Sequence, residues 1–365
     1  MALYRSAFGF SKKVLEELKQ KTQDMDPFKK HGGLLVDELK LLEHLSVKQS
    51  GQIEGFVDLG EFTTAADKTM HSDHGMVILF VPFVGGWTQV IGTFATKGNI
   101  KGDFLAQVMI DATILTERSG LFVDFITCDG ATWNRRMWKV LGVRGTAGDV
   151  KCKVEHPVDD RRHLHFISDF PHLIKCLRNG LMKCPFNTPD GHVTMCHVRE
   201  AYKIDSSSLT LKAMPGITKC HLQPNSFEQQ RVSYAFQLFG ERVLQGLHLY
   251  KADIEAKTGP IDGTQEFFRR INRIICVMTS RFPGEALRPN SSSTEALSGF
   301  LKYLAAWEKH AGGAGGFLSE STATGLRFSE DCKIRECGCM CSKCLAGYAS
   351  EQHQLPSQQQ LVGSG

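Results

Sequence analysis

The sequence lacks the features of a membrane or secreted protein. Its 365 residues contain no run of eighteen apolar residues, so no segment is long and apolar enough to cross a bilayer as a helix. The opening residues, MALYRSAFGFSKK, lack the basic-then-apolar order of a secretory signal, which predicts an intracellular chain. Without such a signal, the 12 cysteines do not indicate a disulfide framework.

Strong charge of one sign is also missing, because the net charge is only +4. That value fits a neutral enzyme as well as a nucleic-acid binder. Two local basic clusters stand out, one at Arg135, Arg136 and Lys139 and the other at Arg161 and Arg162. Such clusters bind nucleic acid by neutralising phosphates and releasing counterions, but each could equally be an ordinary solvated surface. The sequence leaves both interpretations open.

Five of the cysteines crowd into one short segment, at Cys332, Cys337, Cys339, Cys341 and Cys344. Four thiolates suffice for a tetrahedral zinc site, but only Cys341 and Cys344 have a common zinc-finger spacing. The alternative is a segment of unrelated sequence that does not fold. The polar, Gln-rich residues that follow favour that alternative, so residues 329–365 are predicted to be a Cys- and Gln-rich disordered tail.

The first half of the chain has the pattern of an α/β domain with a mixed sheet. Residues 8–23 have helical spacing with Ser11 as the expected N-cap, and residues 1–30 form a helical lead-in. Apolar strand-like runs follow, first by themselves and then alternating with helices, over residues 31–182. In this region we expect QIEGFVDLGEF to be a half-buried strand and Asp103 to cap a helix.

The second half has a different pattern. Residues 183–328 contain long amphipathic segments, such as FEQQRVSYAFQLFGERVLQGLHLY, and are predicted to form an all-helical domain.

Three aspartates lie where chemistry is expected. Asp37 interrupts an apolar strand, and Asp129 and Asp169 each follow one. Leu34 to Val36 beside Asp37 predict that its carboxylate is buried, which is costly unless it is paired or bound to a metal. Capping of a turn is the alternative for Asp129 and Asp169. Converging carboxylates could hold two divalent metals for phosphodiester chemistry, and oxygen ligands suit Mg²⁺ or Mn²⁺.

Five sequence motifs follow one another along the chain: LLVDELKL, IEGFVDLGE, CDGATWNRRMWKVLG, SDFPHLIKCLRNGL and FLSESTATGLR. In order and spacing they resemble the P element transposase family, which includes the THAP-domain-containing transposase relatives of animals. The resemblance covers roughly residues 8–328. It implies an RNase H-like catalytic domain over residues 31–182 and a helical insertion domain of the GTP-binding type over residues 183–328.

The resemblance also implies site residues, cofactors and partners. Asp37 matches the first catalytic, metal-binding aspartate and Asp129 the second, while Asp169 and His172 match a D-x-P-H-L-I-K block of unassigned role. Implied cofactors are Mg²⁺ or Mn²⁺ and GTP. Implied partners are DNA and a further copy of this chain or a full-length transposase, with no membrane. The implied location is the nucleus.

The departures from the family pattern matter as much. The family's S/N-Q-D-x-x-E-x-x-F motif, which supplies the remaining catalytic acid, does not occur after Arg327. No THAP zinc-finger spacing precedes residue 30, and no G-x-x-x-x-G-K-[ST] loop is present. Relatives carry an Asp and an Asn where Cys276 and Thr279 stand, which weakens the expectation of GTP binding. We therefore expect a catalytically incomplete, truncated transposase that performs little strand transfer alone.

Two rival hypotheses remain open. One is a metal-dependent nuclease in which another acid replaces the missing one. The other is a regulatory module that binds DNA or a full-length transposase.

Overall fold

The computed structural model describes residues 8–41, 46–47, 53–208, 211–280, 287–288, 290–313 and 315–335. The chain divides into two compact units. The first comprises the residues up to Gly145 together with Asp149–Ser168. The second comprises Thr146–Gly148 and the chain from Asp169 onward.

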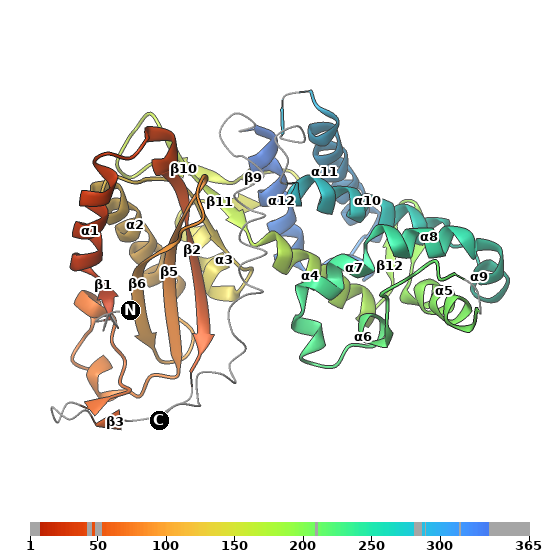
Figure 1. Cartoon of the computed structure of the whole chain (residues 1–365), viewed down its shortest axis with the longest axis horizontal. Coiled ribbons are helices and arrows are strands. Elements are labelled where there is room, and N and C mark those ends of the chain that lie inside the picture. The colour runs from red at the N-terminus through yellow and green to blue at the C-terminus, as the bar shows by residue number, and fades with distance from the viewer. Residues whose placement is uncertain are drawn as a thin grey trace. The chain divides into compact units, whose positions relative to one another are not determined.

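A seven-stranded mixed sheet forms the centre of the first unit (Figure 1). Its spatial order is β1 (Gly9–Phe10), β6 (Gln89–Thr96), β5 (His74–Pro82), β2 (His31–Lys40), β7 (Phe122–Cys128), β11 (His163–Ser168) and β10 (Lys153–Glu155). The pairs β2–β7 and β7–β11 are parallel, whereas the other neighbours are antiparallel. The predicted mixed α/β sheet is confirmed.

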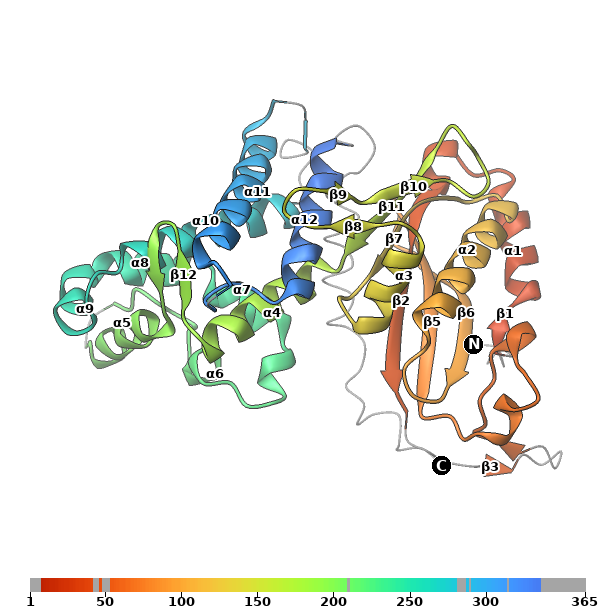
Figure 2. The ribbon, with the colours of Figure 1, turned by 180° about the vertical axis from the view of Figure 1, so that it is seen from behind.

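Three helices lie along one face of this sheet, namely α1 (Lys12–Thr22), α2 (Gly102–Arg118) and α3 (Thr132–Val140) (Figure 2). The Ser11 hydroxyl accepts a hydrogen bond from the Val14 N–H at 3.4 Å and caps α1, as predicted. Strands β5 and β6 form a hairpin whose connection includes Gly85, at φ +124°, a conformation that glycine adopts without strain.

Two local predictions are wrong. QIEGFVDLGEF is mostly irregular, because only β4 (Ile53–Glu54) and two isolated bridges are extended, and Gly55 and Gly60 adopt positive φ. The N-cap of α2 is Lys101, while Asp103 lies inside the first turn. A Cβ at Gly102 would lie 2.5 Å from Arg136 Cβ and 2.6 Å from the Trp133 carbonyl oxygen, so the first turn of α2 has room only for glycine at this position.

Minor elements complete the first unit. They are β3 (Ser46–Val47), which pairs with β4, the hairpin of β8 (Arg144–Gly145) and β9 (Val150–Lys151), and the 3₁₀ turns η1 (Pro27–Lys30), η2 (Gly60–Phe62) and η3 (Asp67–Thr69).

In the described residues of the second unit, the regular structure is helical apart from one short hairpin and one 3₁₀ turn. Its helices are α4 (Phe170–Lys183), α5 (Met195–Ser207), α6 (Lys219–Leu222), α7 (Val232–Leu238), α8 (Glu241–Leu249), α9 (Lys251–Thr258), α10 (Asp262–Thr279), α11 (Ser292–Ala311) and α12 (Glu320–Arg335). The hairpin pairs β12 (Phe186–Thr188) with β13 (Gly191–Val193), and the turn is η4 (Glu228–Gln230). Phe186, Phe267 and Trp307 pack ring against ring in the core.

Within the described residues, no helix has the length and apolar character needed to span a membrane. The predictions for Cys337, Cys339, Cys341 and Cys344 lie outside the described residues.

Candidate functional site

The parallel strands β2 and β7 bring the two predicted catalytic aspartates to the same edge of the sheet. Leu35 on β2 pairs with Thr127 on β7. Two residues further along each chain are Asp37, still within β2, and Asp129, directly after β7. Each aspartate thus lies two residues beyond the last paired residues of the β2–β7 ladder, at the same end of the two strands.

Asp37 differs from the prediction in its burial. Leu34, Leu35 and Val36 are buried, but Asp37 is exposed. The strand runs past the edge of the core at this point, so the carboxylate faces solvent without the cost of desolvation. Its Oδ1 accepts a hydrogen bond from the Glu38 N–H at 2.9 Å.

Asp129 is held by the segment that leads into α3. Its Oδ1 accepts hydrogen bonds from the Ala131 N–H at 2.9 Å and from Asn134 Nδ2 at 2.8 Å. The carboxylate therefore does stabilise a turn, as the alternative interpretation proposed. Asn134 is 5% exposed, so its packing fixes the orientation of the Asp129 side chain.

Glu38 is a further acid near this edge that no motif in the sequence indicated. Its Oε1 accepts a hydrogen bond from the Ile100 N–H at 3.2 Å, while its Oε2 is buried with no hydrogen-bond partner among the described residues. Burial raises the pKa of Glu38, and the neighbouring charges of Asp129 and Asp37 raise it further, against opposing effects from Ile100 and His74. Adjacency to Asp37 in the sequence was the only signal available.

Asp169 directly follows β11 and begins the second unit. It is the residue before α4, and its backbone carbonyl accepts the Leu173 N–H at 3.0 Å. Pro171 lies in the first turn of α4, where its missing N–H costs no intrahelical hydrogen bond. His172 follows on the same helix and is partly buried.

The acids fit a divalent metal by their chemistry, because Mg²⁺ and Mn²⁺ prefer carboxylate oxygens. However, across the part of the chain that the structure describes, no group of three or more His, Cys, Asp or Glu side chains gathers as a metal site would require. Asp37 and Asp129 are thus a candidate pair rather than a complete ligand set.

Of three arginines from the two basic clusters, Arg136 and Arg161 form exposed ion pairs, whereas Arg162 is mostly buried. Arg136 donates to both carboxylate oxygens of Asp103, at 2.9 to 3.3 Å, on the surface. Arg161 donates to Asp159 at 3.1 Å and is also exposed. Arg162, by contrast, is largely buried and binds two carboxylates at once, those of Glu117 at 2.9 Å and Asp124 at 3.2 Å.

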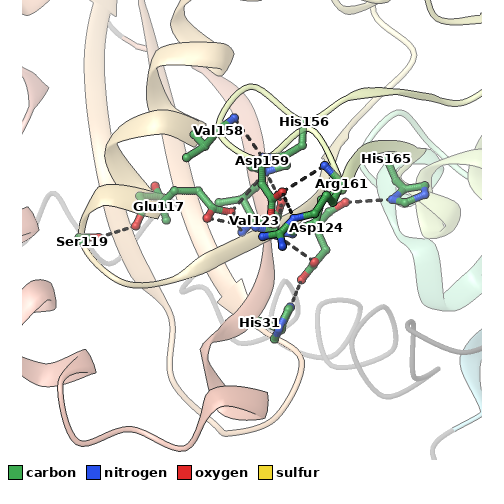
Figure 3. Close-up of polar contacts among 12 residues, drawn as sticks. His31, Glu117, Ser119, Val123, Asp124, His156, Val158, Asp159, Arg161 and His165 are labelled. Carbon is green, nitrogen blue, oxygen red and sulfur yellow. Dashed lines mark hydrogen bonds and ion pairs between the residues drawn. The ribbon is translucent and has the colours of Figure 1, made fainter.

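Figure 3 shows the polar network around these carboxylates. His31 Nδ1 lies 2.8 Å from Asp124 Oδ2, and His156 Nε2 lies 3.3 Å from Glu117 Oε1. Burial disfavours the charged form of Glu117, but hydrogen bonds from His156, the Val123 N–H and Arg162 outweigh that effect and lower its pKa. The network joins α2, β2 and β7 at the start of β7, so it stabilises the sheet whose other end carries Asp129.

A second candidate site lies in the second unit, between α8 and α10. A cavity of about 540 Å³ is lined by Glu241, His248, Arg269, Arg273 and Cys276, among others. Arg269 forms an ion pair with Glu266, and Arg273 donates to the Ser292 carbonyl at 3.3 Å. Two exposed guanidinium groups on one helix face can bind phosphates, and Glu241 offers a carboxylate for the amino and imino groups of a base. The residues therefore fit a phosphorylated nucleotide, although Cys276 supplies no charge.

Comparison with known proteins agrees with this division of the chain. Residues 6–142 match the family described as "TNP-like, RNase H N-terminal domain" and residues 171–286 match "TNP-like, GTP-binding insertion domain". The Homo sapiens DNA transposase THAP9 is 24% identical over 277 residues, which is 75% of this chain and 30% of that protein.

A relative from Drosophila melanogaster, the transposable element P transposase, is 28% identical over 167 residues, covering 45% of this chain and 21% of its own length. The fold also matches a solved structure, the Drosophila P element transposase strand transfer complex, with a TM-score of 0.75 and 18% identity, over 98% of this chain and 77% of that one. The chain is related to the P element transposases.

The relationship to P element transposase confirms the predicted fold, an RNase H-like mixed sheet with a helical insertion. The chain aligns with less than a third of the length of each of the two sequence relatives. Asp37 and Asp129 lie within the region matched by the RNase H model, and the α8–α10 cavity lies within the region matched by the insertion model.

Proposed function

We propose that this P element transposase relative binds DNA in the nucleus, and that Asp37 and Asp129 are the metal-binding pair of its RNase H-like domain. The register of β2 against β7 supports the proposal, because its last pair, Leu35 and Thr127, lies two residues before each aspartate. A bound Mg²⁺ or Mn²⁺ would activate an oxygen nucleophile and stabilise the leaving oxygen of a phosphodiester. The protein would orient Asp129 through Asn134 and the Ala131 N–H.

We further propose that this pair alone supports little strand transfer. Two carboxylates leave most of the six positions around Mg²⁺ or Mn²⁺ to water and substrate, so binding to the chain alone should be weak and the metal poorly positioned. Efficient catalysis would need a further carboxylate, from a later segment, from another copy of this chain or from a full-length transposase.

Calorimetry with Mn²⁺ tests the pair. We expect weak binding by the wild-type chain that is lost in Asp129→Asn and retained in the control Asp24→Asn, an exposed aspartate on α1's C-terminal side. Metal binding that survives Asp129→Asn and Asp37→Asn would contradict the assignment. Efficient joining of a labelled DNA end to plasmid by the wild-type chain would contradict the proposed incompleteness.

Glu38 supports a second candidate function, a metal-dependent nuclease with a substituted acid. Its unpartnered Oε2 lies in the field of both Asp37 and Asp129. This function predicts Mn²⁺-dependent nicking of supercoiled plasmid that is lost in Glu38→Gln. Nicking that is absent from the wild-type chain, or unaffected by Glu38→Gln, would reject it.

For the second unit we propose nucleotide binding in the α8–α10 cavity, with GTP as the first ligand to test. The exposed Arg269 and Arg273 support binding of its phosphates. A fluorescent GTP analogue should bind the wild-type chain and lose affinity in Arg269→Gln with Arg273→Gln, but not in Lys302→Gln, an exposed lysine on α11. Equal affinity in all three proteins would contradict this site.

A further inference from the structure

A second cavity, in the first unit, lies beside the edge that carries the aspartates. We infer that it holds a nucleobase of single-stranded DNA while Lys97 and Lys101 bind the adjoining phosphates. The inference rests on the proposed DNA binding. It extends that proposal, since it names the state of the DNA and the residues that contact it.

The cavity has a volume of about 360 Å³, within the range of pockets that enclose small organic groups. Its apolar walls come from the irregular segment 57–70 and from the β6–α2 connection, and include Val57, Leu59, Phe62, Met70, Ile100 and Phe104. Phe62 and Phe104 meet edge to face, with ring centroids 5.4 Å apart at 84°. Both rings are only partly buried, so aromatic surface remains for stacking.

The rim of the cavity is positively charged. Lys97 and Lys101 are exposed, and neither ammonium group forms an ion pair or hydrogen bond with any residue that the structure describes. Asp67 is the acid at the rim, but its carboxylate already accepts hydrogen bonds from the Thr64 N–H at 2.8 Å and hydroxyl at 2.7 Å. Lys101 interacts electrostatically with Asp67, but two lysines still outnumber this one acid at the rim. That balance of charge favours a phosphodiester over a cationic or neutral ligand.

One backbone hydrogen bond connects this cavity with the acidic edge. Ile100 forms part of the wall, and its N–H donates to Glu38 Oε1, on the residue next to Asp37. A base in the cavity would therefore direct its sugar-phosphate backbone close to the carboxylates. Aromatic rings interleaved with lysines are the usual means of holding single strands without reading their sequence, whereas a paired base in a duplex could not enter.

The test uses the full chain in EDTA, so that it does not depend on metal or catalysis. A short single strand carrying 2-aminopurine should bind with a rise in fluorescence, and a duplex of the same sequence should not show that rise. Phe104→Ala should weaken binding of the single strand about fivefold or more, as expected for one lost stacking contact. Lys97→Gln with Lys101→Gln, which leaves the apolar wall intact, should weaken it and lower its dependence on salt.

Two matched controls identify the cavity. Phe28→Ala removes an exposed phenylalanine that does not line the cavity. Lys68→Gln removes a lysine on η3 that does not line it either. Both variants should bind the single strand like the wild type. Equal losses in the controls, or none in the cavity variants, would overturn the inference even if metal-dependent cleavage were found. Binding of a free mononucleotide as tight as that of the strand would overturn it too, because the ligand would then not be DNA.

Discussion

Asn134 donates a hydrogen bond from Nδ2 to Asp129 Oδ1 at 2.8 Å, and this contact fixes the carboxylate at the end of β7. Asn134 is itself buried on α3, so the orientation of a candidate metal ligand depends on the packing of a helix. Groups that orient a ligand affect metal affinity nearly as much as the ligand does.

Asn134→Ala should therefore weaken Mn²⁺ binding about tenfold or more without removing any carboxylate. Calorimetry measures the affinity, and Val140→Ala on the exposed side of the same helix is the control. Unchanged affinity in Asn134→Ala would show that Asp129 needs no support from α3.

Adjacent arginines should differ sharply in their effect on stability. Arg162→Met removes the guanidinium from the buried carboxylate of Glu117 and the partly buried one of Asp124, and should cost about 3 kcal/mol of unfolding free energy. Arg161→Met breaks an exposed pair with Asp159 and should cost less than about 1 kcal/mol. Denaturant unfolding, followed by tryptophan fluorescence, checks both values, and similar losses would refute the structural role of Arg162.

Glu117 should make the first unit sensitive to acid. Its hydrogen bonds to His156 and the Val123 N–H, together with Arg162, outweigh burial and hold its pKa below the usual range. The stabilisation is therefore complete above the unfolded-state pKa of glutamate and is lost as the pH falls through the lower pKa of the folded state. In Glu117→Gln, stability measured from pH 7 to pH 3 should fall less steeply than in the wild type. Parallel curves would contradict this assignment.

Arg178 should contribute strongly to the stability of the second unit. Its side chain is completely buried and donates to the backbone carbonyls of Arg231, at 3.3 Å, and Gln229. Burial lowers its pKa. Arg178→Met would remove its donors from the Arg231 carbonyl and leave the Gln229 carbonyl only its long bond from Asn179, at 3.4 Å. It should cost about 2–4 kcal/mol, with faster hydrogen exchange around η4. The control is Lys175→Met, on the same helix as Arg178. It removes only an exposed hydrogen bond to Gln230 and should change the unfolding free energy little.

The phenol of Tyr250 should ionise at a higher pH than an ordinary tyrosine. Burial, and then its hydrogen bond to Asp205 at 2.9 Å, raise the pKa of the phenol. The stabilisation from this contact is thus present below the unfolded-state pKa of tyrosine and is lost as the pH rises through the folded-state pKa. Tyr250→Phe should remove a late component from the absorbance titration at alkaline pH. An unchanged titration curve would rule out the shift.

Several local features were predictable because they depend on neighbouring residues alone. Ser11 caps α1 since its hydroxyl reaches an N–H three residues away, and Pro171 suits the first turn of α4. The family resemblance, carried by motifs around Asp37 and Asp129, gave the RNase H-like fold in advance.

Long-range packing explains the predictions that were wrong. An apolar run predicted a buried Asp37, but the exposure of a strand residue depends on where the sheet's core ends. The same limit hid the roles of Arg161 and Arg162, which look alike in sequence. Only one of them reaches the carboxylates of Glu117 and Asp124.

The sequence by itself determined the class of fold and named Asp37 and Asp129 as candidates, because strand and helix periods and short motifs are properties of consecutive residues. Only the tertiary structure decided that Glu38 joins those aspartates at one edge, and that Ile100 links this edge to a cavity with a basic rim. These relationships depend on register between distant strands and on the path of irregular segments, and no local pattern encodes them.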